Sequence, residues 1–173
     1  MSNTVTIIAA TTKDVAKLVK LVNSAYRGEG SKKGWTTEAD LLDGIRTDEA
    51  SLMQMLETPG NTILKYSGNG NLLGCVYLSK KQGKLYLGML TVAPELQARG
   101  IGKQLLLAAE AYARQTYCTA LTMTVISVRH ELIAWYERHG YLPTGETQPF
   151  PTDPAFGLPK QPLQFIVMEK QLA

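Results

Sequence analysis

A glycine-rich bend with two cationic side chains is the feature of this sequence best suited to chemistry. The run Leu90–Lys103 reads LTVAPELQARGIGK and places Gly100 and Gly102 just ahead of a long segment with helical periodicity. Glycine lets a backbone turn sharply and approach a ligand closely, and the first amides of a helix point outward without an intrahelical acceptor. Arg99 and Lys103 add positive charge. We therefore expect the bend to bind an anion, and a pyrophosphate fits it better than an apolar ligand.

A strand must precede this bend and a helix must follow it. Period-two runs separated by turn sequences predict three short antiparallel strands, Thr62–Tyr66, Leu72–Leu78 and Lys84–Val92. After Pro94, apolar residues at helical spacing predict a long helix from about Ile101. The glycines therefore lie where a strand gives way to a helix.

Similar signals predict the remaining elements. They are a strand at Val5–Ile7, a helix from Thr11 to about Arg27, a shorter helix from Thr37 through Leu42, helical turns at Asp48–Glu57, a strand at Leu121–Val125, a helix at His130–His139, and strands from Tyr141 and at Leu163–Met168. Five prolines between Pro149 and Pro162 exclude a regular helix or an interior strand there. That segment is expected to be a long stiff loop, which is either functional or a structural wrap over the sheet.

Composition limits the class of protein. The chain has 173 residues, of which 45% are hydrophobic and 19% charged, so we expect one domain over residues 1–173. The net charge of +3 is far below the basic footprint of nucleic-acid binding, and no nucleic-acid partner is expected. The sequence has no apolar run long enough for a membrane span and no signal-peptide pattern, which favours a cytoplasmic protein without membrane association. Cys75 and Cys118 lie in apolar segments and are expected to be reduced and buried.

Motifs of several other enzyme classes are missing from the sequence. It has no Walker Gly-Lys-Ser/Thr run, no Gly-x-Ser-x-Gly elbow and no pair of histidines in a metal-ligand pattern. The glycines of Gly68–Gly74 are expected to form a hairpin turn, because no helix follows them. Phosphoryl transfer, serine hydrolysis and zinc chemistry therefore lose support, and no metal is expected.

Two signatures in the chain match one known family. Gln97–Gly102 reads QARGIG, and Trp135–Tyr141 reads WYERHGY at a helix-to-strand junction. Together they resemble the GNAT superfamily of acetyl-CoA-dependent N-acetyltransferases, whose signature is Gln or Arg, two residues, Gly, one residue, and Gly or Ala. The order of elements from Val5 to Met168 is also similar. The resemblance implies an α/β GNAT fold, with a mixed, mostly antiparallel sheet of six to seven strands flanked by about four helices.

The resemblance also implies how acetyl-CoA is bound. Strand Leu87–Val92 would bind the pantetheine arm mostly through its backbone, and the bend amides would bind the pyrophosphate. The sheet would splay between this strand and Leu121–Ile126, where Gly88 either marks an irregularity or accommodates packing. The expected cofactor-binding residues are Leu90, Thr91, Val92, Gln97, Ala98, Arg99, Gly100, Ile101, Gly102 and Lys103.

Tyr136 matches the family's usual proton donor to the departing thiolate, and a phenol with a pKa near 10 suits that task. Its alternative role is that of a core tyrosine. Backbone amides near Met89 and Leu90 are the candidates to polarise the thioester carbonyl. Many family members carry a glutamate on the strand before the signature, but Leu85–Leu90 contains no carboxylate. The alternatives for the base are another residue or a water chain, with the candidates Glu29, Glu38, His130 and Glu131.

In this family the acceptor usually meets the segment between the first two helices, which here is Tyr26–Thr37 and makes Glu29 and Trp35 candidate contacts. Trp35 either walls a pocket or packs the loop down. Arg129 stands where the family often has asparagine, and it either is a neutral surface replacement or clamps a carboxylate or phosphate of the acceptor. The segment Pro149–Pro162 can close the same pocket from the other side.

The function implied by the resemblance is transfer of acetyl from acetyl-CoA to a primary amine of a small molecule, by direct attack in a ternary complex. The missing strand carboxylate and the changed Asn position leave open an acyl-CoA-binding sensor without turnover. Acetylation of a protein or peptide amine is a third alternative. A homodimer through paired final strands is also left open.

Overall fold

Seven strands form one mixed sheet in the order β1-β3-β4-β5-β6-β9-β7. The computed structural model describes residues 4–27, 42–43, 46–97, 99–150, 158–161 and 163–172. The strands of the sheet are β1 Val5–Ala9, β3 Asn61–Gly68, β4 Asn71–Lys81, β5 Lys84–Val92, β6 Ala120–Ile126, β7 Leu142–Pro149 and β9 Gln164–Gln171. Neighbouring strands are antiparallel except for β5 and β6, which are parallel. The expected α/β architecture is confirmed.

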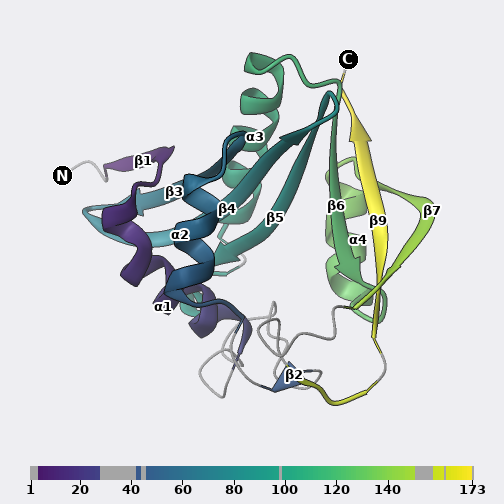
Figure 1. Cartoon of the computed structure of the whole chain (residues 1–173), viewed down its shortest axis with the longest axis horizontal. Coiled ribbons are helices and arrows are strands. Elements are labelled where there is room, and N and C mark those ends of the chain that lie inside the picture. The colour runs from purple at the N-terminus through teal and green to yellow at the C-terminus, as the bar shows by residue number, and fades with distance from the viewer. Residues whose placement is uncertain are drawn as a thin grey trace.

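In the part of the chain that the structure describes, four α-helices cover the two faces of this sheet. Figure 1 shows α1 (Val15–Tyr26) and α2 (Glu49–Glu57) on one face, and α3 (Ile101–Gln115) and α4 (His130–Arg138) on the other. Each face has its own core of buried apolar side chains. The core under α3 and α4 includes Leu105, Leu121 and Tyr136, and the core under α1 and α2 includes Leu18 and Leu52.

Local sequence signals account for several element boundaries. The Thr11 side chain and Asp14 form a capping box at the 3-10 turn Thr12–Asp14, which leads into α1. The Asp48 carboxylate accepts a hydrogen bond of 2.8 Å from the Ser51 amide and caps α2. The hairpins at Asn69–Gly70 and Gln82–Gly83 have two central residues with positive φ, as tight β-turns require.

The predicted helix from Thr37 through Leu42 is wrong at its end. Leu42 and Asp43 form the short strand β2 (Leu42–Asp43), which pairs antiparallel with β8 (Leu158–Pro159). The rest of that predicted helix lies outside the described residues. A partner more than 100 residues away in the sequence decides this conformation, so helical periodicity could not reveal it.

The proline-rich segment contains neither a helix nor an interior strand in the part that the structure describes, but the expected loop is interrupted there by β8 (Leu158–Pro159). Pro149 ends β7, which lies at the sheet edge and pairs only with β9 in the order of strands. An edge strand tolerates proline because one side of its backbone needs no ladder partner. Cys75 and Cys118 are free and buried, as expected.

Candidate active site

The bend before α3 exposes backbone amides. Gly100 is the N-cap of α3 with φ 85° and ψ 0°, a left-handed conformation that side chains other than glycine rarely adopt. A Cβ at Gly102 would lie 3.3 Å from the Trp135 ring. The Gln97 side-chain amide donates a 3.0 Å hydrogen bond to the carbonyl oxygen of Val92, which ties the bend to β5. The first amides of α3, which lack intrahelical acceptors, therefore open beside Trp135.

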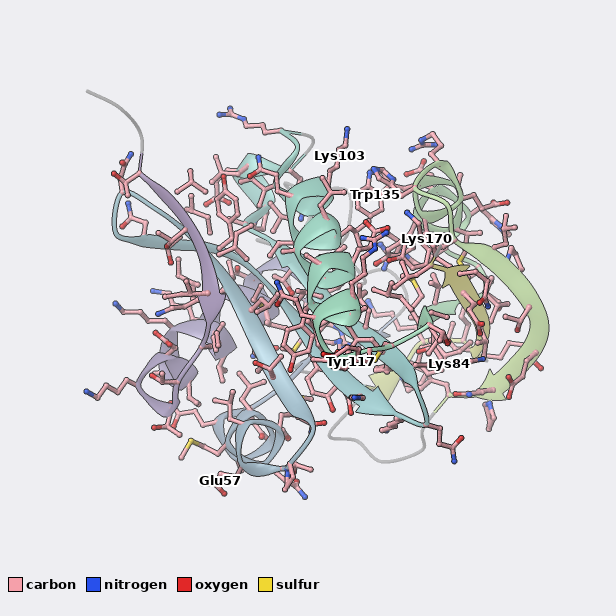
Figure 2. The ribbon with its side chains drawn as sticks, turned by 90° about the horizontal axis from the view of Figure 1, so that it is seen from above. Glu57, Lys84, Lys103, Tyr117, Trp135 and Lys170 are labelled. Atoms are coloured by element: carbon pink, nitrogen blue, oxygen red, sulfur yellow. The ribbon has the colours of Figure 1, made fainter. Side chains whose placement is uncertain are left out.

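A cavity of about 600 Å³ lies at this end of α3. Figure 2 shows Lys103 and Trp135 at the N-terminal end of α3, and Tyr117 at its opposite end. Seven of the predicted cofactor contacts line the cavity: Leu90, Val92, Gln97, Gly100, Ile101, Gly102 and Lys103. Arg138 of α4 adds a second cation to Lys103, and Glu131 is a carboxylate in the same lining. Open helix amides and two cations fit a ligand that carries phosphate groups.

The other three predicted cofactor contacts are placed differently. Thr91 is only 1% exposed, and its position in β5 pairs with Cys75 of β4. Arg99 is exposed and does not belong to the lining of the cavity. Ala98 lies outside the described residues.

Next to the cavity, β5 separates from β6. Their parallel pairing covers only Lys84–Tyr86 with Ala120–Thr122, after which the two strands diverge (Figure 1). The Tyr86 hydroxyl and the Thr124 hydroxyl are 3.2 Å apart and bridge the two strands where the opening begins. The edge of β5 beyond Tyr86 is therefore left without a strand partner on this side.

A β-bulge lies at this open edge. Between the pairs Tyr77–Gly88 and Cys75–Thr91, β4 has one residue whereas β5 has two, Met89 and Leu90. Met89 has φ 51°, which is unusual for a residue with a side chain. The irregularity expected near Gly88 is thus present one residue later, and a Cβ on Gly88 would lie 3.0 Å from the Tyr86 ring.

The bulge and its flanking strand leave alternate backbone groups on the open edge. The Ala93 amide donates a 2.9 Å hydrogen bond to the Leu73 carbonyl of β4. Because neighbouring residues of a strand turn their backbone groups to opposite sides, those of Val92 face away from β4. Leu90 and Val92 both line the cavity.

Tyr136 lies on α4 at the inner end of the cavity. Its side chain is buried, and its ring makes edge contacts with the rings of Trp135 and Tyr141, at centroid distances of 5.2 and 5.9 Å. Burial raises the pKa of its hydroxyl well above the ordinary value of 10.0, and the nearby Tyr26 phenol acts in the same direction, whereas Arg129 lowers it. Tyr136 is therefore protonated at neutral pH and can donate a proton.

A second cavity, of about 610 Å³, lies on the other side of Tyr136. It extends between the diverging strands β5 and β6 and reaches β7 and β9. Both cavities are lined by the same four residues at their junction: Tyr26, Leu90, Leu132 and Tyr136. Two ligands, one in each cavity, would therefore meet beside the Tyr136 side chain and the β5 bulge.

Most of the charged side chains that line the second cavity are cations. Within the part of the chain that the structure describes, its lining contains Arg27, Arg46, Lys81 and Arg129 against one carboxylate, Glu146. Arg129 precedes α4 as its N-cap residue. An anionic group of a ligand is favoured in such surroundings.

Two candidates for the base are not brought to this junction. His130 is exposed and lines neither cavity, and Glu131 lines only the first one. The other predicted residues Glu29, Trp35 and Glu38 lie outside the described residues.

Arg46, Arg138 and Glu146 line the cavities although no sequence motif indicated them as contacts. Tyr26 begins the segment expected to meet the acceptor and lines both cavities, but the hydrogen bond from its hydroxyl to the Leu90 carbonyl oxygen was not predicted. Arg46 and Glu146 lie in the second cavity from segments with no motif of their own. No local signal distinguishes them from other surface charges.

Two further observations concern the described residues alone. No group of three or more His, Cys, Asp or Glu side chains among them is arranged to hold a metal ion. None of the helices in that part of the chain is long and apolar enough to cross a membrane.

Comparisons with known proteins agree with this geometry. The fold is similar to the ribosomal-protein-S18-alanine N-acetyltransferase of Escherichia coli, with 16% identity, a TM-score of 0.73, and coverage of 98% of this chain and 95% of that one. It is also similar to the ribosomal-protein-alanine N-acetyltransferase of Brucella melitensis, with 22% identity, a TM-score of 0.71, and coverage of 96% and 99%. The PaiA N-acetyltransferase of Thermoplasma acidophilum, solved in complex with coenzyme A, matches with 18% identity, a TM-score of 0.67, and coverage of 98% and 99%. Among curated proteins there is no significant match.

A family model covers most of the chain. The model of the acetyltransferase (GNAT) family matches residues 18–141, a span that contains the β5 bulge, the bend before α3 and Tyr136. Members of this family use acetyl-CoA as acetyl donor. The chain therefore belongs to the GNAT family and is an acyltransferase.

Proposed function

We propose that this enzyme transfers acetyl from acetyl-CoA to a primary amine of a small molecule, by direct attack while both substrates are bound. The observation that carries the proposal is the junction of two cavities at Tyr26, Leu90, Leu132 and Tyr136. The second cavity, of about 610 Å³, has the size of a small-molecule site. A covalent acyl-enzyme is not needed, because both ligands would reach the same point.

The first cavity is the proposed acetyl-CoA site. The amides of the bend from Gly100 to Lys103 would bind its pyrophosphate, and Lys103 and Arg138 would add charge to phosphate groups. The Val92 N–H, on the open edge of β5, would bind the pantetheine arm. Acetyl-CoA supplies the acetyl thioester, and the residues at the junction act on it.

Tyr136 is the proposed proton donor. In the reaction, the amine nitrogen forms a bond to the acetyl carbon, the carbon–sulfur bond breaks, and the sulfur keeps the electron pair. The Tyr136 hydroxyl then gives its proton to the sulfur, and the proton lost by the nitrogen returns to the phenol through water. Burial raises the pKa of Tyr136, so the phenol carries its proton before the reaction and acts as an acid only toward a base as strong as the departing thiolate.

The acceptor we propose carries a carboxylate or phosphate group besides its amine. Support comes from the cations of the second cavity, of which Arg129 and Arg46 are best suited to bind such groups in a bidentate manner. Glu146 is the proposed contact of the acceptor's ammonium group before the proton is lost.

Acetyl transfer to a protein N-terminus is the second candidate function. It is favoured by the likeness to the two ribosomal-protein-alanine N-acetyltransferases. A peptide would need to enter the second cavity through an open groove. The acceptor experiment below separates the two candidates.

The test is release of coenzyme A thiol from acetyl-CoA with three groups of amines. The first group contains small amines with a carboxylate or phosphate, the second contains the same amines with that group converted to a neutral amide or removed, and the third contains peptides with an N-terminal alanine. We expect the anionic small amines to have the highest kcat/KM, at least 10-fold above their neutral counterparts, because one lost charge-assisted contact is worth about 1.5–3 kcal/mol. Preference for the peptides would refute the small-molecule proposal, and equal rates for charged and neutral amines would refute the anionic acceptor.

A further inference from the structure

Thr91 is buried at the β5 bulge, and its hydroxyl has a specific partner. It donates a 2.9 Å hydrogen bond to the carbonyl oxygen of Met89, two residues earlier in the strand. The Cys75 sulfur of β4 lies 4.0 Å from the same oxygen and is a second, weaker donor. The Met89 carbonyl is therefore held toward β4.

The orientation of this carbonyl determines the direction of the next amide. In a trans peptide unit, the C=O bond of one residue and the N–H bond of the next point in opposite directions. All described peptide bonds are trans. With the Met89 carbonyl directed at the Thr91 hydroxyl and the Cys75 sulfur, the Leu90 N–H is directed away from these two side chains, and Leu90 itself lies where the two cavities meet.

The backbone at Met89 needs such support. Its φ of 51° is in the left-handed region, where a residue with a side chain is strained unless its surroundings hold it. The neighbouring Leu90 carbonyl is held as well, since it accepts the hydrogen bond from the Tyr26 hydroxyl. Both peptide units on either side of Leu90 are thus fixed by side-chain hydroxyls.

We propose that Thr91 is a positioning residue, whose hydroxyl orients the Leu90 N–H at the cavity junction so that this amide polarises the acetyl carbonyl during transfer. The inference rests on the proposed function, since it assumes that the acetyl group lies at the junction. In this role Thr91 is not the cofactor contact that the sequence predicted, but supports the backbone amide that acts on the substrate. Preorganised backbone amides of this kind stabilise the negative charge that develops on a carbonyl oxygen.

The test compares Thr91→Val with Thr91→Ser. Valine keeps the shape of threonine and loses the hydroxyl, whereas serine keeps the hydroxyl. We expect Thr91→Val to lower kcat roughly 10-fold, less than the 100-fold or more that removal of an oxyanion donor costs, because the amide is misdirected rather than lost. The Kd for acetyl-CoA should change less than threefold, and Thr91→Ser should restore kcat.

A spectroscopic readout separates positioning from general destabilisation. The infrared carbonyl stretch of bound acetyl-CoA labelled with carbon-13 in the acetyl carbonyl reports its polarisation. This stretch should move toward its value in solution in Thr91→Val and remain as in the wild type in Thr91→Ser. Thr116→Val is the matched control, because the Thr116 hydroxyl also bonds a backbone carbonyl, that of Tyr112 at 2.9 Å, but at the far end of α3. It should alter the melting temperature without altering the stretch.

Each outcome bears on one proposal. If Thr91→Val leaves both the stretch and kcat unchanged, or if Thr91→Ser fails to restore them, the role of Thr91 is refuted. If the wild type turns over none of the amines, the proposed acceptor is refuted, and the stretch in the two variants still decides the role of Thr91.

Discussion

Replacement of Tyr136 by phenylalanine removes the proposed acid and little else. The phenyl ring can keep its edge contacts with Trp135 and Tyr141 and its place in the wall between the two cavities. We therefore expect Tyr136→Phe to fold normally and to bind acetyl-CoA with a Kd within about twofold of the wild type, because the proposed cofactor contacts are backbone groups and cations elsewhere.

The expected loss of activity follows from the protonation state of the phenol. General acid catalysis contributes roughly 10² to 10⁴ in rate, and it is most effective when the pKa of the acid lies near the working pH. Burial raises the pKa of Tyr136 further from that range, which places its contribution at the lower end. We expect kcat to fall about 100-fold, equivalent to about 2.7 kcal/mol of transition-state stabilisation.

Tyr141→Phe is the matched control. Tyr141 is fully buried and lies beside Tyr136, but it lines neither cavity. Its hydroxyl has no hydrogen-bond partner among the described residues, so its removal should raise the free energy of unfolding by about 1 kcal/mol. Its kcat should equal that of the wild type.

The assay is initial-rate thiol release at saturating acetyl-CoA, with urea unfolding of both variants. It should be repeated from pH 7 to pH 9.5, where the wild type should show no loss of kcat from ionisation of Tyr136, because its pKa lies above 10.0. A kcat of Tyr136→Phe within threefold of the wild type would remove the phenol from the mechanism. An equal loss in Tyr141→Phe would show that packing, and not proton donation, is responsible.

Three further predictions concern the cofactor cavity, the core and the thiols. Gly102→Val should weaken acetyl-CoA binding at least 10-fold by calorimetry, because even its Cβ would lie 3.3 Å from the Trp135 ring and its methyl groups would crowd the helix amides; unchanged affinity would contradict the proposed pyrophosphate site. Lys170→Met should lower the free energy of unfolding by about 2–3 kcal/mol, because it leaves the buried Glu110 carboxylate without its ion pair, although the 28% exposure of the Lys170 side chain lets water compensate in part. In urea unfolding, the double variant with Glu110→Gln should recover most of this loss. No recovery would count against the pairing. Burial raises the pKa of the Cys75 thiol to about 12, so iodoacetamide should modify Cys75 at pH 8 only after denaturation. Mass spectrometry measures this labelling, and rapid labelling of the native protein would contradict the burial of Cys75.

Local sequence signals predicted the elements whose boundaries depend on neighbours in the chain. The helix start at Thr11 and the turns between the strands are confirmed, because the capping box at Thr11 and the positive φ angles of the turns involve residues within a few positions. The helix predicted through Leu42 is wrong there, because that residue pairs with Pro159. A contact of such sequence separation leaves no periodic signal.

The candidate site also has features that local sequence signals predicted and features that depend on distant contacts. The bend from Gln97 to Lys103 and the position of Tyr136 followed from motifs in the chain, and the structure places them around one cavity. Two features of the site did not follow from any motif. They are the pairing of Thr91 with Cys75 of β4 and the hydrogen bond from the Tyr26 hydroxyl to the Leu90 carbonyl oxygen. Tyr26 and Leu90 are 64 residues apart, and an apolar position on a helix indicates only that the side chain is buried.

Residue types at short spacing were enough to predict the family, the order of the elements and the glycine bend before α3. Tertiary structure alone decided that β5 carries two residues opposite one of β4, that β6 leaves β5 after three residue pairs, and that the two cavities meet at Tyr136. The physical reason is that strand register and strand separation arise from packing between elements distant in the chain. A single sequence contains the residues of those contacts but not their pairing.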